Sequence, residues 1–341
     1  MNNQRDKGWK RREFISTLGA AATGALLGLR PESAAAEPPL ETTRLRLLKF
    51  PSLCLAPQYV AEELLHAEGF TDVQYLEFPE EGIAAYGRLG SGELDISQGF
   101  IAPSIVQIDR GTPLLLLAGV HVGCFELFGT DRVRAIRDLR GKTVAVPAFG
   151  SSPHVFLTAM LAYVGLHAGK DVNFIERPPA EAKRLLAEGK IDGYMGFPPD
   201  PQELRAKKIG HVVVNSVVDR PWSQYFCCLV AGNRQFVQKH PVATKRAIRA
   251  ILKADEICAS QPERAARTLV ERGFTKNYDY ALQAMKDVPY GHWRDFDAED
   301  TVRFYALRLN EAGVIKSSPQ RIIAQGTDWR FLRELKKELK A

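Results

Sequence analysis

Short apolar runs alternate with segments of helical periodicity along most of the chain after residue 43. The apolar runs predict strands at 45–50, 73–78, 95–99, 114–122, 143–146, 172–175 and 191–196. The helical segments lie between them, at 56–68, 81–91, 103–109, 153–164 and 180–188. Beyond residue 234 the pattern is helical, at 241–260, 262–272, 278–286, 298–312 and 330–340. Alternation of strand and helix predicts an α/β fold, with mostly parallel sheets flanked by helices.

One seven-residue pattern occurs twice in the chain. Residues 89–95 read L-G-S-G-E-L-D and residues 186–192 read L-A-E-G-K-I-D, so both fit L-x-x-G-x-[LI]-D. We interpret each copy as a helix whose leucine packs on a sheet, a glycine that ends the helix, and a short step into the next strand. Each copy follows the second predicted strand of its half and precedes the third, which predicts two similar α/β lobes.

The first 36 residues have the composition of an export signal rather than of a folded core. A basic cluster at 10–12 contains two adjacent arginines, an apolar stretch follows at 15–29, and Ala34 and Ala36 offer an A-x-A cleavage site. The apolar stretch is too short for a membrane span, which needs about 20 residues. We predict a twin-arginine export signal over 1–36, cleaved near Ala36, and a periplasmic mature protein that begins with a polar leader at 37–42. The alternative is an amphipathic N-terminal helix of a cytoplasmic protein.

Charge and cysteine content exclude several classes of function. The chain has 46 basic and 40 acidic side chains; residues 1–36 hold 6 and 3 of them, so the remainder has 40 and 37, a net charge of +3. This balance does not indicate nucleic-acid binding. The spacings of the five cysteines and seven histidines match no disulfide framework or zinc motif, so we expect no metal and no cofactor. The adjacent Cys227 and Cys228 are interpreted as small buried hydrophobic residues.

Five segments together resemble a known family. These are the strand and turn F-P-S-L-C-L-A-P at 50–57, the two L-x-x-G-x-[LI]-D copies, the segment D-L-R-G-K-T-V-A-V at 138–146, and G-S-S at 150–152. In order and spacing they resemble periplasmic solute-binding proteins of the type II fold, in the nitrate, sulfonate and taurine branch called NMT1/THI5-like. The resemblance implies two lobes joined by two crossovers, with the ligand cleft between them. Lobe one would comprise 43–138 plus 232–341, and lobe two 139–231. It also implies a small-molecule ligand, an ABC permease as partner and a monomeric protein.

The turn before the predicted helix at 153–164 is a candidate anion site. Ser152 is a good N-cap and Pro153 a favoured first helical residue. Because a helix N-terminus carries about half a positive charge, its free N–H groups bind anions. We therefore predict a cradle formed by Gly150, Ser151, Ser152 and His154. The alternatives are a cap that binds nothing and a catalytic serine, although His154 occupies the place of the last glycine in a G-x-S-x-G elbow.

Further candidates follow from the rule that ligands bind at the carboxyl ends of strands in open α/β sheets. Residues at such predicted ends, or just before the return crossover, are Ser52, Leu53, Cys54, Gln98, Gly99, Phe100, His121, Phe197, Trp222 and Tyr225. Four are aromatic and few carry charge, which suits a small organic ligand with one anionic group, or an aromatic or heterocyclic ligand. A sulfonate or related anion is the first expectation, followed by a pyrimidine or an aromatic carboxylate.

Three functions are compatible with these patterns. The first is ligand binding for an ABC importer, which accounts for the export signal and the two lobes without any catalytic constellation. The second is an enzyme of the same fold that synthesises a pyrimidine; its cysteine-rich motif is matched here only by Cys227 and Cys228. The third is a ligand sensor that docks to a receptor.

Overall fold

The computed structural model describes residues 37–339. The predicted export signal over 1–36 lies outside the described residues. Both sheets of the protein belong to the compact unit Leu40–Ala341. Within the described part of the chain, no helix combines the length and apolarity that a bilayer crossing requires.

The first sheet has the strand order β2-β1-β3-β10-β4. Its strands are β1 (Arg44–Lys49), β2 (Asp72–Glu77), β3 (Ile96–Phe100), β4 (Leu114–Val122) and β10 (Phe226–Asn233). Strand β10 runs antiparallel to both of its neighbours, whereas β1 is parallel to β2 and β3. Every residue of β4 and β10 is buried, as expected for strands covered on both faces.

The second sheet repeats this arrangement, in the order β7-β6-β8-β5-β9. Its strands are β5 (Glu126–Gly129), β6 (Thr143–Val146), β7 (Asn173–Glu176), β8 (Gly193–Gly196) and β9 (His211–Asn215). Here β5 is antiparallel to both neighbours, in the position that β10 holds in the first sheet. The shared strand order confirms the two-lobed α/β fold expected from the sequence.

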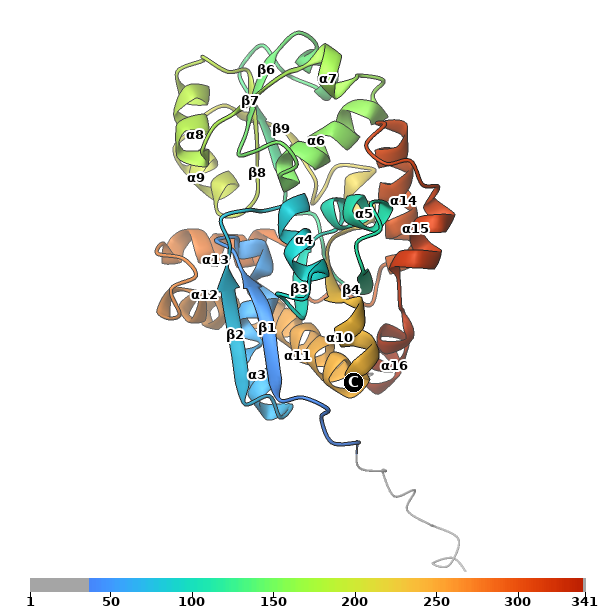
Figure 1. The fold of residues 1–341 in the computed structure, drawn as a ribbon. Helices are drawn as coiled ribbons and strands as arrows, with labels where there is room; N and C mark the ends of the chain where they lie inside the picture. Colours follow the sequence, from blue (N-terminus) through green and yellow to red (C-terminus); the bar gives the residue numbers. More distant parts are fainter. Residues whose placement is uncertain (1–36, 340–341) are drawn as a thin grey trace, which may run out of the picture. The chain divides into compact units, whose positions relative to one another are not determined.

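Helices flank both sheets (Figure 1). Those within the two α/β halves are α2 (Ala56–Val60), α3 (Glu62–Ala67), α4 (Ile83–Gly90), α5 (Ile101–Asp109), α6 (Ser152–Tyr163), α7 (Ala168–Asp171), α8 (Pro179–Ala187) and α9 (Asp200–Ala206). Those after β10 are α10 (Arg234–Lys239), α11 (Pro241–Ser260), α12 (Pro262–Glu271), α13 (Tyr278–Asp287), α14 (Ala298–Glu311), α15 (Pro319–Gly326) and α16 (Arg330–Glu338). Three short 3-10 helices are η1 (Leu53–Leu55), η2 (Ile136–Leu139) and η3 (Trp222–Gln224). Helices α11, α15 and α16 pack on β4, so the C-terminal helices complete the first sheet's half of the protein.

The structure corrects several sequence-based expectations. The helix expected at 56–68 is two helices, broken at Ala61. Strands β5, β9 and β10 and helices α9, α10 and α15 were not predicted. The chain passes between the sheets at 123–125 and 216–225, rather than at the lobe limits expected near residues 138 and 231. Strands β5 and β10 cause this difference, because hydrogen bonds to distant segments, not local pattern, decide which sheet each strand joins.

The duplicated L-x-x-G-x-[LI]-D pattern has the same structural role in both sheets. Asp95 Oδ2 accepts a 2.7 Å hydrogen bond from the backbone N–H of Arg46 in β1, and its Oδ1 pairs with the Arg46 guanidinium. In the second sheet, Asp192 Oδ2 accepts from the N–H of Thr143 at 2.9 Å, and its Oδ1 pairs with Arg132. Each aspartate therefore anchors the strand that holds the same position in its own sheet, β1 in the first and β6 in the second.

Replacing Asp95 by alanine is expected to lower the free energy of unfolding by about 2 kcal/mol. The change leaves the N–H of Arg46 and its partly buried guanidinium without their acceptor. Chemical denaturation measures the effect. Glu93→Ala is the matched control, because its pair with Arg88 is exposed and contributes little to stability. Equal losses in the two variants would contradict the anchoring role of Asp95.

Candidate functional site

A cavity lies where turns of the two sheets meet. Its lining residues come from both halves of the protein: Leu48, Phe50, Ser52, Cys54, Leu55, Glu81, Gly82, Ala85, Tyr86, Leu89, Ser97, Gln98, Gly99, Phe100, Cys124, Phe125, Ser152, Phe197 and Cys228. The cavity volume is about 60 Å³. Because a cavity of about 150 Å³ holds one benzene ring, this space takes only a few waters as it stands, and a ligand of one ring would require the surrounding turns to move apart.

The turns that close this cavity approach each other tightly. The N–H of Ile83 at the start of α4 donates to the Gly150 carbonyl oxygen at 3.1 Å, and the N–H of Leu53 donates to the Pro198 oxygen at 3.0 Å. Gly82 has a φ of +61°, and a Cβ atom there would collide with the carbonyl oxygen of Gly150. A glycine is therefore required where the first sheet's turn touches the second.

Glu81 is the charged group of the cavity. The hydroxyl and the backbone N–H of Ser152 donate to its carboxylate, and burial raises the pKa of Glu81 to about 7 despite these two bonds. The Oε1 atom is closed off from solvent and has no hydrogen-bond partner. Among the described residues that line the cavity, there is no lysine, arginine or histidine. The cavity thus presents a negative or half-protonated carboxyl with one unused acceptor.

Gln98 supplies a second unused acceptor. Its Nε2 donates to the Cys54 carbonyl oxygen at 2.9 Å, which defines the orientation of the amide. Its backbone N–H donates to Gln58 Oε1 at 2.7 Å. The buried Oε1 of Gln98 has no partner. Both unsatisfied polar side-chain atoms of the cavity lining are therefore acceptors when Glu81 is ionised.

Aromatic rings form a large part of the cavity wall. Phe125 lies between Phe100 and Phe197, with ring centroids 4.9 Å and 5.7 Å away. Phe50 packs on Phe197 at 6.0 Å. The Tyr86 hydroxyl also lies at this wall, but it donates to the Phe100 carbonyl oxygen at 3.0 Å and is not free. Such walls accept a flat apolar ring.

The structure changes the interpretation of the turn at 150–154. Ser151, not Ser152, is the N-cap of α6, and its side chain makes no capping bond. The N–H of Gly150 donates to His154 Nδ1 at 3.0 Å, and the N–H of Ser151 donates to the Ala148 oxygen at 3.1 Å. The N–H of Ser152 is used by Glu81. The cradle predicted for an external anion is therefore occupied by a carboxylate of the chain itself.

The structure brings about half of the predicted site residues into the cavity lining. These are Ser52, Cys54, Gln98, Gly99, Phe100, Ser152 and Phe197. The strand-end rule identified six of them, since they lie at the carboxyl end of β3 or just after β1 and β8.

The other predicted residues lie outside the lining. Leu53 and Trp222 are core residues; the Trp222 ring packs on Phe156 at 5.3 Å. Tyr225 stacks on Phe304 at 3.9 Å. The His121 ring contacts the carbonyl oxygens of Cys54 and Gly123, each at 3.1 Å. Gly150, Ser151 and His154 form the turn behind Ser152 without lining the cavity.

Sequence reasoning missed Glu81 and Phe125, which define the chemistry of the cavity. Glu81 belongs to the acidic pair before Gly82, just after β2, so the strand-end rule could have identified it. Phe125 lies in the connection between β4 and β5. No local pattern indicated its position, because β5 was not recognised as a strand.

Comparisons with known proteins agree on family and fold. The sequence profile of the NMT1-like family matches residues 38–271. A nitrate/nitrite binding protein NrtA from Nostoc sp. is 22% identical, with 83% of this chain and 75% of the relative covered. The periplasmic nitrate-binding protein NrtA from Synechocystis superposes with a TM-score of 0.71 at 18% identity, covering 89% of this chain and 90% of that one. The alkanesulfonate-binding protein SsuA from Xanthomonas axonopodis, bound to MOPS, has a TM-score of 0.66 at 19% identity, covering 86% and 100%.

Proposed function

The chain belongs to the NMT1-like family, and on this premise we propose that it is a solute-binding protein that delivers a small ligand to an ABC permease. The observation that carries the proposal is the small cavity where turns of the two sheets meet, lined by residues of both. The names of the relatives support it, since they describe binding proteins for nitrate, nitrite and alkanesulfonates. We propose no enzymatic activity.

The ligand that best matches the groups of the cavity is a flat molecule that donates hydrogen bonds or carries a positive charge. The ionised carboxylate of Glu81 and the free amide oxygen of Gln98 both require donors. Nitrate and sulfonate offer only acceptors, and they would meet Glu81 without a balancing cation in the cavity lining. Of the ligands expected from the sequence, a pyrimidine or a related amino-substituted heterocycle therefore fits better than a sulfonate.

Export to the periplasm by the twin-arginine pathway completes the proposal. It rests on the order of basic cluster, apolar stretch and A-x-A site in residues 1–36. Solved structures of similar fold include proteins described as periplasmic, which supports an exported location.

A thermal-shift screen of the purified protein tests the proposed function. The panel should contain nitrate, taurine, an alkanesulfonate, an aromatic carboxylate, an aminopyrimidine and an aromatic amidine. We expect stabilisation by an N–H-rich ring, worth about 4 kcal/mol at a ligand concentration 1,000 times the Kd. Stronger stabilisation by a sulfonate or nitrate would overturn the ligand class and leave the binding function intact.

Lack of any saturable binding across the panel would count against the binding function itself. Co-purification with membrane proteins then separates delivery from sensing. Capture of an ABC permease supports delivery, whereas capture of a receptor kinase would assign the protein to the sensing alternative.

A further inference from the structure

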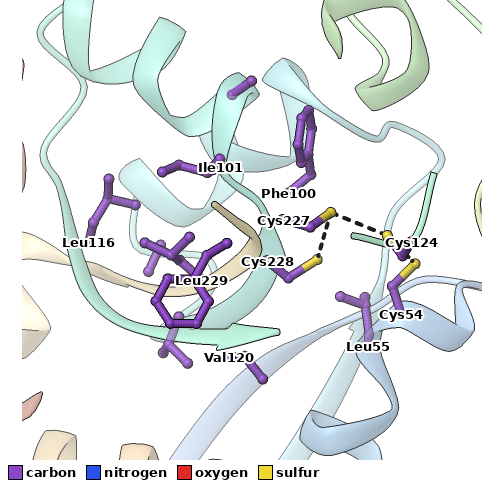
Figure 2. Close-up of a cluster of buried hydrophobic side chains, with 14 of the residues drawn as sticks. Cys54, Leu55, Phe100, Ile101, Leu116, Val120, Cys124, Cys227, Cys228 and Leu229 are labelled. Carbon is purple, nitrogen blue, oxygen red and sulfur yellow. Dashed lines mark hydrogen bonds between the residues drawn. The ribbon is translucent and has the colours of Figure 1, made fainter. Parts of the chain in front are cut away.

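Four buried cysteines bring their sulfur atoms together beside the cavity. This thiol cluster comprises Cys54 of η1, Cys124 between β4 and β5, and Cys227 and Cys228 of β10. The Sγ–Sγ distances are 3.1 Å from Cys54 to Cys124, 3.2 Å from Cys124 to Cys227, and 3.9 Å from Cys227 to Cys228. Figure 2 shows the sulfur atoms turned toward one another at the edge of the apolar core. None of the four is in a disulfide.

A backbone irregularity allows the adjacent residues Cys227 and Cys228 of β10 both to contribute a sulfur atom to the cluster. Successive side chains of a regular strand point to opposite faces of the sheet. The register between β10 and β4 shifts on both sides of Cys228. Such a bulge re-aims a side chain. As a result, the sulfurs of Cys227 and Cys228 lie near each other and near Cys124.

Cys124 is held in an unusual backbone conformation. Its φ is +147°, and it follows Gly123 at +58°. A non-glycine residue in such a region costs about 1–3 kcal/mol, and strain of this kind concentrates at functional sites. The strained residue is the one whose sulfur touches both Cys54 and Cys227, so it lies at the centre of the cluster.

The geometry points to a three-sulfur site for a thiophilic d10 metal ion, formed by Cys124, Cys227 and Cys228. The sulfurs of these three residues lie within 4.8 Å of one another. Three sulfurs at about 2.3 Å from one ion would stand about 4 Å apart in a plane, close to the 3.9 Å between Cys227 and Cys228. The pair Cys124 and Cys227 would need to open by less than about 1 Å. All-sulfur ligation selects soft ions such as copper(I) and zinc.

The groups beside the three cysteines favour ligation of the ion by sulfur. Both ring nitrogens of His121 lie 3.1 Å from backbone carbonyl oxygens, so the ring is already engaged. Cys54 reaches Cys124 and is a further thiol at the edge of the site. Because Cys54, Cys124 and Cys228 also line the cavity, an ion reaches the site through the same space as the ligand. A bound ion would tie the β4–β5 connection to β10, where the two sheets are joined.

Metal titration of the reduced protein tests this site. The protein, kept reduced and free of oxygen, is titrated separately with zinc(II) and with copper(I) supplied as an acetonitrile complex. We expect one ion per chain to remain after gel filtration for at least one metal. X-ray absorption of that sample should show a shell of sulfur neighbours at about 2.3 Å, without nitrogen or oxygen.

Two variants and one control make the result specific. Cys124→Ser and Cys227→Ser should each weaken metal binding at least tenfold. Cys258→Ser should keep one ion per chain, because Cys258 is equally buried in α11 but outside the cluster. Circular dichroism checks that each variant folds; if one does not, the absorption spectrum of the unaltered protein still decides the question.

Several outcomes would overturn the site. One is the absence of metal retention by the reduced protein. Another is full retention by folded Cys124→Ser and Cys227→Ser variants, or a first shell with nitrogen or oxygen. A further outcome is a protein in which two thiols of the cluster are oxidised by air to a disulfide and which takes up no metal after reduction. That result would show a redox pair instead of a metal site.

Discussion

Glu81→Gln is expected to lower the affinity for the ligand found in the screen by about 10- to 100-fold. A hydrogen bond to a charged group contributes about 1.5–3 kcal/mol, and each 1.4 kcal/mol is a factor of ten in Kd. The side chain keeps its size but loses its charge, while Ser152 keeps an acceptor in the amide oxygen. Isothermal titration calorimetry measures the change.

The matched control for this experiment is Glu80→Gln. Glu80 is the adjacent residue, pairs with Arg88 at 3.2 Å and does not line the cavity. Its replacement should leave the Kd within about twofold, as expected for an exposed pair. Equal affinities of the Glu81→Gln variant and the unaltered protein would remove Glu81 from the binding site.

The same residue predicts how binding depends on pH. Burial raises the pKa of Glu81 to about 7, so the carboxyl is ionised above that value and protonated below it. The affinity for a cationic or donor ligand should therefore be highest above pH 7 and fall as the pH is lowered through 7. The Glu81→Gln variant should show a flatter profile across this range. Identical profiles in the two proteins would contradict the assignment.

Without ligand, the effect of pH on stability has the opposite sign. A carboxyl whose folded-state pKa lies above the ordinary 4.5 favours the folded state most when protonated. Its contribution is fully present below about pH 4.5 and is lost as the pH rises through about 7. Relative to Glu81→Gln, the Tm of the unaltered protein should therefore fall as the pH is raised from 5 to 8.

Phe125→Ala is expected to lower the free energy of unfolding by about 3–5 kcal/mol. The Phe125 ring is 2% exposed and contacts Phe100, Phe156 and Phe197. Its removal enlarges the cavity, and the lost contacts add to the transfer free energy of the ring. Denaturant titration measures the loss, and the screen should then show weaker selection for ligands of one ring.

Phe149→Ala is the control for the stability measurement. Phe149 is 59% exposed, at the turn before α6. Surface substitutions of this kind usually change stability by about 0.5 kcal/mol or less. A loss of less than 1 kcal/mol in Phe125→Ala would show that the wall around the cavity collapses to fill the space, and would weaken the argument for a preformed pocket.

Local sequence pattern predicted the elements best where the hydrophobic period was strong and the ends were marked. The strand at 114–122 and the helix at 241–260 have the predicted limits. The duplicated L-x-x-G-x-[LI]-D pattern also predicted a true repeat, because its aspartates accept from the equivalent strands β1 and β6 of the two sheets. The family profile confirms the family to which these segments pointed.

The candidate site was predicted only in part, for a physical reason. Strand ends such as Ser52 and Gln98 could be identified, since parallel strands bring their carboxyl ends to one edge. Whether a backbone N–H at the helix start is free to bind a ligand depends on which side chains from elsewhere in the chain lie beside it. Glu81 lies about 70 residues before Ser152 in the chain, and no local rule indicates that its carboxylate occupies that helix start.

The amino-acid sequence by itself determined the α/β class, the repeat of the two halves and the family, because hydrophobic periodicity and short motifs are local properties. Only the tertiary structure decided how β5 and β10 pair, how Glu81 fills the predicted anion cradle, and how four cysteines meet beside the cavity. Cys124 and Cys227 are separated by 103 residues, yet their sulfurs are 3.2 Å apart. Such contacts are set by the pairing of distant strands, which depends on the free energy of the whole fold.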